Sequence, residues 1–317
     1  MNAKMNRRQM AATCLGIVAS LPSSGALNAA GPKRKFTMDL CPGRIGVGSD
    51  QLRTIELASQ YGFESVEPFG NALVKLSDAE NASLLEGLAA KNLVWGAAGL
   101  SVEFRQEAER FDSDLKLLPN VARALQRAGV SRVGTWLMPN HATLTYRKNF
   151  QRHVKRLRQI ADVLGDYGLS LGLEYVGPKT LWTKNRFVFV HTMEETKELL
   201  SEIGASNVGF VLDSWHWYTA EETKEELLTL QAGDIIAVDL NDAPTGIAVA
   251  DQIDNRRELP MATGVIDIRS FLSALVEIGY NGPVRAEPFN KPLNDLDDEP
   301  AVAATAKALN SAFAVVS

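Results

Sequence analysis

The sequence of 317 residues is poor in cysteine, with only Cys14 and Cys41. Cys14 and Cys41 are far apart in the sequence and do not form a zinc-type cysteine cluster. A chain of this length can bury a core large enough to be stable without disulfides. We therefore expect packing, rather than cross-links, to hold the fold together.

The sequence also lacks long apolar runs and an excess of basic residues. No run of about 18 apolar residues occurs, so no membrane-spanning helix is expected. The formal net charge is −5 and the pI is about 5.5, which argues against a nucleic-acid partner. A hydrophobic content of 45% with 22% charged residues is that of an ordinary globular protein.

The first 30 residues differ in kind from the rest. Lys4, Arg7 and Arg8 precede a short apolar stretch (10–21) and a stretch of small residues (22–31). This order predicts an export signal over residues 1–30, followed by a domain over residues 31–317. The Arg7–Arg8 pair favours twin-arginine export to the periplasm, with an ordinary secretory signal as the alternative. After cleavage, no stable membrane insertion is expected.

Short apolar runs alternate with amphipathic stretches along the rest of the chain. The expected strands are residues 36–40, 65–69, 94–100, 132–137, 169–175, 208–214, 235–240 and 283–289. The expected helices are residues 50–61, 77–91, 112–128, 149–167, 192–203, 221–231, 267–279 and 298–315. Eight strand–helix units predict an α/β fold, a (β/α)8 TIM barrel. An open doubly wound sheet is the alternative, but "CPGRIGVG" (41–48) does not fit its dinucleotide-binding fingerprint.

Acidic residues recur where the expected strands end. They are Glu67 on the second strand, Glu174 on the fifth, Asp213 on the sixth, Asp239 on the seventh and Glu287 on the eighth. In a barrel, these strand ends build the active site. Neighbouring carboxylates raise one another's pKa, and a bound divalent cation relieves that repulsion. Oxygen ligands suit Mn²⁺ or Mg²⁺, so we expect one such ion.

Several motifs along most of the chain resemble the xylose-isomerase-like TIM barrels. These motifs are "GFESVEP" (62–68), "LEYVGP" (173–178), "LDSWHW" (212–217), "VDLNDAP" (238–244), "RELPMATG" (257–264) and "GYNGPVRAEPF" (279–289). The family includes sugar phosphate isomerases and epimerases, ketose 3-epimerases, inosose isomerases and dehydratases, and endonuclease IV. Endonuclease IV is a poorer match because it uses several extra histidines, and this chain has four.

The resemblance implies one metal ion held by Glu174, Asp213, Glu287 and a residue of the seventh strand. Relatives often have a histidine there, whereas this chain has Asp239. If Asp239 points elsewhere, His216 becomes the candidate fourth ligand, or the site is incomplete. A second departure is "RELPMATG", where relatives often read R-x-LPGEG, so the loop that contacts the substrate is expected to differ.

The implied chemistry is metal-dependent isomerisation or epimerisation of a sugar or keto-sugar through an enediolate. Glu174 and Glu287 would form the acid/base pair, one removing and the other returning a proton. One alternative is a lyase or dehydratase that acts on 3-keto-sugar or inosose-like substrates by β-elimination. A second alternative is a non-catalytic sugar-binding barrel. The expected partner is therefore a small carbohydrate, and the oligomeric state is left open.

Further residues are candidates for substrate binding. They are His216, Arg257, Glu67, Trp182, Trp215 and Lys179. The resemblance implies that His216 binds substrate oxygens, while the tryptophans could stack on a sugar ring or simply pack in loops. Arg285 precedes Glu287 by two residues and so lies on the same strand face. It is expected either to offset the charge of the carboxylates or to pair with a core acid.

Overall fold

A computed structural model describes residues 33–316 of the chain. The export signal expected in residues 1–30 lies outside the described residues. None of the helices in residues 33–316 combines the length and apolar character needed to cross a bilayer.

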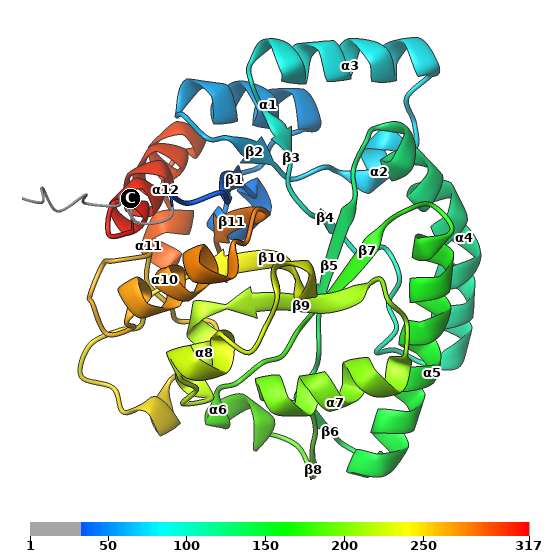
Figure 1. Cartoon of the computed structure of the whole chain (residues 1–317), viewed down its shortest axis with the longest axis vertical. Coiled ribbons are helices and arrows are strands. Elements are labelled where there is room, and N and C mark those ends of the chain that lie inside the picture. The colour runs from blue at the N-terminus through cyan, green and yellow to red at the C-terminus, as the bar shows by residue number, and fades with distance from the viewer. Residues whose placement is uncertain (1–32, 317) are drawn as a thin grey trace, which may run out of the picture. The chain divides into compact units, whose positions relative to one another are not determined.

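The described residues contain one sheet of parallel strands (Figure 1). Its strands are β1 (Thr37–Leu40), β2 (Ser65–Val66), β3 (Val94–Trp95), β4 (Ala98–Gly99), β5 (Arg132–Trp136), β7 (Ser170–Glu174), β9 (Val208–Asp213), β10 (Ile235–Leu240) and β11 (Pro283–Ala286). The strand order is β3-β2-β1-β11-β10-β9-β7-β5-β4. Because β3 and β4 at the two ends of this order belong to one chain segment, the sheet closes on itself, as the barrel prediction requires.

The expected third strand, residues 94–100, is split into β3 and β4 at Gly96. A side chain at this position would begin only 2.3 Å from the carboxylate oxygen Oδ1 of Asp39. The backbone can therefore pass Asp39 only at a glycine.

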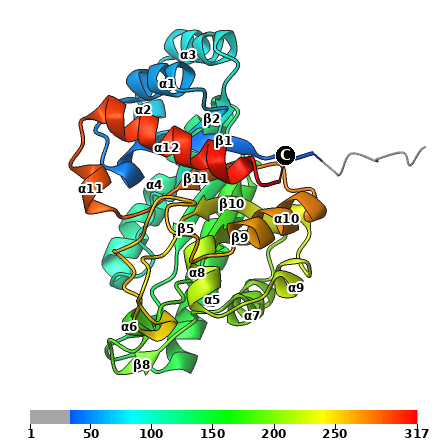
Figure 2. The ribbon, with the colours of Figure 1, turned by 90° about the vertical axis from the view of Figure 1, so that its left-hand side faces the viewer.

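Helices surround the strands (Figures 1 and 2). The longer ones are α1 (Gln51–Gln60), α3 (Asp78–Ala90), α4 (Ala108–Arg127), α5 (Tyr146–Gly165), α7 (Met193–Ile203), α10 (Ile268–Ile278) and α12 (Asp298–Phe313). Short helices are α2 (Gly70–Leu73), α6 (Lys179–Trp182), α8 (Ser214–Thr219), α9 (Lys224–Leu227) and α11 (Lys291–Asn294). The short strands β6 (Asn140–His141) and β8 (Phe187–Val188) pair antiparallel in the connecting loops.

The helix expected over residues 221–231 is much shorter in the structure, where it is reduced to α9. Thr223 caps its first turn, with its side chain accepting from the Glu226 amide. The amides of Thr229 and Leu230 then bond to carbonyls three residues back, to Glu226 and Leu227. The chain thus tightens into 3₁₀-type turns and does not continue as an α-helix.

The register of the strands places the site. Asp239 on β10 lies opposite Asp213 on β9 and opposite Arg285 on β11. On the other side of β9, Trp136 at the end of β5 lies opposite Glu174 at the end of β7. Parallel strands end at the same side of the sheet, so these side chains gather at one mouth of the barrel.

Candidate active site

Four acidic side chains converge at this mouth of the barrel. Glu174 ends β7, Asp213 ends β9, Asp239 lies in β10, and Glu287 follows β11 by one residue. All four are at least nine-tenths buried. Single carboxylate oxygens of Glu174, Asp239 and Glu287 lie within 4.8 Å of one another. The structure thus brings together four of the five strand-end acids expected from the sequence, and these four are the expected metal ligands; Glu67 is not among them.

Three arginines contact these acids. Arg257 Nη1 donates to Asp213 Oδ2 at 2.7 Å and lies 3.4 Å from Glu287 Oε2. Arg44, from the 3₁₀ turn Pro42–Ile45 after β1, donates to Glu287 Oε1. Arg285 is buried with its guanidinium against Asp239. The mouth of the barrel is therefore a network of alternating charges. Such pairing is expected, because isolated buried charges are costly.

Asp239 is held mainly by Arg285. Its Oδ1 accepts from Arg285 Nε at 2.6 Å, whereas Oδ2 has only longer contacts, 3.3 Å to Arg285 Nη2 and 3.4 Å to Arg44 Nη1. Burial alone would raise the pKa of Asp239, but the two guanidinium groups outweigh burial and hold the pKa below its ordinary value. Asp239 is thus ionised, and Oδ2 keeps capacity for a further partner.

Glu174 differs from Asp239 in having no arginine against it. Among the described residues, its buried Oε1 has no hydrogen-bond partner. Burial, together with the charges of Glu287, Asp239 and Asp213, raises the pKa of Glu174 well above its ordinary value. This carboxyl group is therefore suited to hold a proton or to bind a cation.

Asp213 and Glu287 also have raised pKa values. Burial raises the pKa of Asp213 to about 7, although Arg257 opposes it. Burial likewise raises the pKa of Glu287, against the charge of Arg44. Asn241 fixes both residues, because its amide Nδ2 donates to Asp213 Oδ1 at 3.0 Å and its Oδ1 accepts from the Glu287 amide at 2.9 Å.

His216 on α8 lies beside the acids, with Nε2 3.7 Å from Glu174 Oε1. Its Nδ1 accepts from the Gly177 amide at 3.3 Å, and its Nε2 lies 3.2 Å from Arg257 Nη2. A side chain at Gly177 would begin 2.6 Å from the His216 carbonyl, so only glycine permits this approach. Burial and Arg257 lower the pKa of His216 to about 3, and the ring is neutral.

The loop that differs from the usual family pattern is tied down by Asp242. Its Oδ2 accepts from the amides of Thr263 and Gly264 at 3.0 and 2.7 Å, and its Oδ1 accepts from the Ile266 amide at 3.0 Å. Within this loop, Arg257 Nη2 donates to Asp254 Oδ1 at 2.7 Å. The hydrogen bonds of Asp242 and Asp254 therefore hold this loop and Arg257 over the acids.

A cavity of about 240 Å³ opens above these residues. It is lined by Trp136, Met138, Glu174, Val176, Leu181, His216, Asp254, Arg257, Glu287 and Phe289. We call it the acidic cavity. It combines three carboxylates, an imidazole and a guanidinium with aromatic walls, which is the usual make-up of a small-molecule site.

Four of the proposed substrate-binding residues do not line the acidic cavity. Glu67 accepts from the Cys41 thiol at 2.9 Å. Trp182 packs on His191, with ring centroids 4.8 Å apart. Trp215 is fully buried, its ring 5.5 Å from Arg257 Cζ, and Lys179 is exposed on α6. Of the six, the structure brings His216 and Arg257 to the acids.

Sequence reasoning missed several residues of the site. Arg44 lies in a glycine-rich turn that carries no signal for an arginine directed into the barrel. Trp136 ends the strand opposite Glu174, so its place follows from the strand ends once the register is known. Asn241 directly follows β10 in the recognised "VDLNDAP" motif and could have been named from it.

The residues present fit a divalent cation. Five carboxylates, counting Asp254, face three guanidinium groups, so full ionisation leaves two negative charges. The partnerless Glu174 Oε1 is a donor atom available to such an ion. Two overlapping groups of side chains in the described residues could hold such an ion: Glu174, Asp239 and Glu287, and Glu174, Asp213 and His216.

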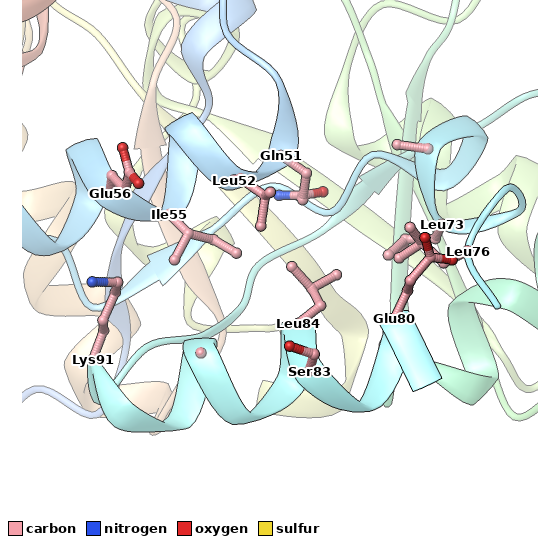
Figure 3. Close-up of a pocket in the computed structure, with 12 residues that line it drawn as sticks. Gln51, Leu52, Ile55, Glu56, Leu73, Leu76, Glu80, Ser83, Leu84 and Lys91 are labelled. Carbon is pink, nitrogen blue, oxygen red and sulfur yellow. The ribbon is translucent and has the colours of Figure 1, made fainter. Parts of the chain in front are cut away.

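A second hollow lies on the outer layer of helices (Figure 3). It has a volume of about 410 Å³, lies between α1, α2 and α3, and includes Leu52, Ile55, Leu73, Leu76 and Leu84 in its lining. None of the four converging acids lines it. It offers apolar surface without the chemistry of the barrel mouth.

The chain belongs to the xylose isomerase-like TIM barrel family, whose model matches residues 55–312. The site described above is thus the barrel-mouth site of a family that includes sugar isomerases and epimerases. The fold and family expected from the sequence are confirmed.

Curated relatives of the chain are enzymes. An inosose isomerase of Bacillus velezensis is 27% identical over 255 residues, which cover 76% of this chain and 84% of that protein. A 3-dehydroshikimate dehydratase of Pseudomonas aeruginosa is 30% identical over 135 residues, 42% of this chain and 20% of that protein.

Solved structures share the fold. A xylose isomerase domain protein from Alicyclobacillus acidocaldarius is 30% identical with a TM-score of 0.78, covering 89% of this chain and 99% of that one. The IolI protein, solved with a bound zinc atom, is 21% identical with a TM-score of 0.73, covering 89% of this chain and 99% of that one.

Proposed function

We propose that the protein isomerises or epimerises a sugar or keto-sugar by moving a proton at a carbon next to a carbonyl group. The observation that carries the proposal is the pair Glu174 and Glu287. Both line the acidic cavity, both are buried, and burial raises the pKa of each. Carboxyl groups with raised pKa values are suited to exchange protons near neutral pH.

The remaining polar residues have binding roles in this proposal. Arg257 and His216 point N–H groups and a ring nitrogen into the cavity, where hydroxyl and carbonyl oxygens of a carbohydrate would lie. Glu174, which has a partnerless oxygen, takes the proton, and Glu287 returns it on the other side of the substrate carbon. Asn241 and Arg257 keep Glu287 in place.

We further propose that Glu174, Asp213, Asp239 and Glu287 hold one divalent ion. When bound, it supplies Lewis-acid polarisation of the substrate carbonyl. A set of four carboxylates favours Mn²⁺ or Mg²⁺ over Zn²⁺. Arg285 orients Asp239 so that Oδ2 is left for the ion.

A lyase or dehydratase is the second candidate. The same proton removal becomes β-elimination when a leaving group stands one carbon further along. The dehydratase among the relatives favours this reading. Release of the leaving group, rather than return of the proton, separates the two reactions.

Export bears on the substrate. If residues 1–30 direct the chain to the periplasm by the twin-arginine route, the substrate is a free sugar or keto-sugar rather than a cytosolic sugar phosphate. Replacing Arg7→Lys and Arg8→Lys together should then block translocation, as followed by cell fractionation. Normal secretion of the double variant would point to the ordinary secretory route.

The proposed function is tested by solvent-deuterium incorporation into a panel of keto-sugars with Mn²⁺-loaded protein. Deuterium at the carbon next to the carbonyl is the expected result. Glu287→Gln should abolish it, while Glu86→Gln, at an exposed position on α3, serves as the matched control. Sugar binding without exchange by any panel member would favour a non-catalytic sugar-binding barrel.

A further inference from the structure

A second polar cavity adjoins the acidic cavity and shares Trp136 and Met138 with it. Its volume is about 220 Å³. Its lining consists of Glu103, Arg105, Gln106, Trp136, Met138, Asn140, His141, Asn149, Arg152 and His153. We call it the basic cavity. A substrate larger than the acidic cavity would therefore extend past Trp136 into this space.

Arg152 on α5 lacks an acidic partner. Its Nη2 donates to Asn149 Oδ1 at 2.8 Å, and no carboxylate of the described residues forms an ion pair with it. Its Nε is buried and has no hydrogen-bond partner within residues 33–316. An unpaired buried N–H is unfavourable unless a ligand completes it. The Nε–H group can therefore donate a hydrogen bond to an oxygen atom of a ligand.

His153 offers a hydrogen-bond acceptor, whereas Arg152 offers a donor. Only 1% of the residue is exposed, and its Nδ1 bonds to the backbone carbonyl of Asn149 at 2.8 Å. Because a carbonyl can only accept, the proton lies on Nδ1, and Nε2 carries a lone pair. This Nε2 is buried and has no partner in the described part of the chain. This Nε2 can therefore accept a hydrogen bond from a hydroxyl group of a ligand.

The charges around the cavity do not cancel. Glu103 and Arg105 form an ion pair at 2.8 Å. Burial and the nearby Arg152 lower the pKa of His141, and burial lowers the pKa of His153 to about 3, so both rings are neutral. The charge of Arg152 is therefore left over.

Groups beyond the lining do not remove this positive charge. Arg156, one turn along α5, adds a second guanidinium and donates to the carbonyls of Phe104 and Gln106. Glu107 is the acid whose field reaches Arg152, and it is exposed. Because exposed charges are screened by water, Glu107 offsets the charge of Arg152 only weakly.

The wall between the two cavities is suited to a sugar ring. Trp136 is 38% exposed although Arg105 Cζ lies 4.3 Å from its ring centroid. An exposed indole offers an apolar surface for the C–H groups of a sugar. Its place next to Glu174 in the strand register connects this wall to the acidic cavity.

We propose that the basic cavity is a second substrate subsite, which binds an anionic, hydroxylated unit of the sugar-acid type beyond the reacting carbonyl. A ring hydroxyl donates to His153 Nε2, and a carboxylate oxygen accepts from Arg152 Nε. The assignment of the subsite to the substrate rests on the proposed function, since it treats both cavities as one cleft. The binding chemistry itself rests only on the residues of the basic cavity.

The test is a binding measurement without turnover. D-glucuronate, D-glucose and inorganic phosphate are titrated by calorimetry into the full protein that carries Glu287→Gln. D-glucuronate is expected to bind about 10-fold more tightly than D-glucose, as one charged hydrogen bond predicts. Phosphate, which has no sugar ring, is expected to bind more weakly than D-glucuronate.

Two variants locate the binding. Arg152→Gln should remove the difference between the two sugars, whereas Lys155→Gln, which removes the same charge from an exposed position of α5, should leave it unchanged. His153→Gln, whose amide oxygen keeps an acceptor, should bind both sugars, whereas His153→Leu should weaken both. Thermal unfolding checks that each variant is folded. If a His153 variant does not fold, the comparison of Arg152→Gln with Lys155→Gln decides the test.

Equal binding of both sugars to the parent protein would overturn the proposal. So would an unchanged preference in Arg152→Gln, or phosphate binding as tightly as D-glucuronate. These outcomes are independent of the proposed function, which fails if no panel sugar exchanges deuterium. Sugar binding without deuterium exchange would support the subsite and contradict the proposed enzymatic function.

Discussion

The acidic cavity and the basic cavity lie on either side of Trp136, and they differ in whether their charged side chains are paired by the fold. In the acidic cavity, Arg257 and Asp213 satisfy each other, and below it Arg285 pairs with Asp239. In the basic cavity, Arg152 has no acidic partner among the described residues. Charges that the fold pairs itself contribute to holding the barrel, whereas unpaired ones indicate a ligand.

The difference extends to single atoms. Of the carboxylate oxygens of the four acids, Glu174 Oε1 is buried without a hydrogen-bond partner in residues 33–316. Across Trp136, an acceptor and a donor, His153 Nε2 and Arg152 Nε, are both left over. In the two proposals above, the acidic cavity carries the reaction and the basic cavity binds the substrate.

The largest expected effect is loss of reaction in Glu287→Gln. The amide keeps the shape of the side chain but cannot exchange a proton, so deuterium incorporation should fall by at least about 10³-fold. Mass spectrometry of the product measures it, with Glu86→Gln as control. Exchange at the parental rate would remove Glu287 from the mechanism.

Arg285→Met should destabilise the protein by about 3–5 kcal/mol, because it leaves the buried Asp239 without its main partner. The double variant Asp239→Leu with Arg285→Met removes both charges and should recover much of that loss. Urea unfolding followed by circular dichroism compares the two. Equal stability of the single and double variants would show that the unpaired carboxylate of Asp239 is not the source of the loss.

Arg44→Gln should tighten binding of Mn²⁺ by about 10-fold, because Arg44 directs a positive charge at Asp239 and Glu287. Titration calorimetry of the metal measures the affinity directly. Arg53→Gln, on the outer helix α1, is the control that changes the same charge elsewhere. Weaker metal binding in Arg44→Gln would mean that Arg44 supports the ligands rather than competing with the ion.

The smallest effect is expected for Arg152→Met. Since no acid depends on Arg152, its loss should change the free energy of unfolding by less than about 1 kcal/mol. Urea unfolding of Arg152→Met and of Arg285→Met compares the free energies of unfolding that the two arginines contribute. A loss as large as that of Arg285→Met would show that Arg152 is structural and that the two cavities do not differ in this way.

Much of the barrel could be predicted because its signals are local. Apolar strands that alternate with amphipathic helices specify eight units, and parallel strands end at one mouth, so Glu174, Asp213, Asp239 and Glu287 were expected to meet. The helix expected over residues 221–231 was too long. Over so few residues, a 3₁₀-type turn has the same spacing of apolar residues as the end of an α-helix.

The partners of the acids were harder to predict. Arg285 was expected to pair with an acid or offset charge because it shares a strand face with Glu287. Arg44 acts from 195 residues away from Asp239 and carries no local signal. Trp182 and Trp215 lie on the short helices α6 and α8, and residue type does not specify how those helices are oriented. The Nε2 atom of His153, which has no partner in residues 33–316, is visible only in three dimensions.

Solvent-deuterium exchange by the Mn²⁺-loaded parent protein tests the central claim most directly. The account predicts deuterium at the carbon next to the carbonyl of at least one keto-sugar in the panel, and none without metal. A protein that binds Mn²⁺ and a keto-sugar together, yet leaves every such carbon unlabelled, would contradict it.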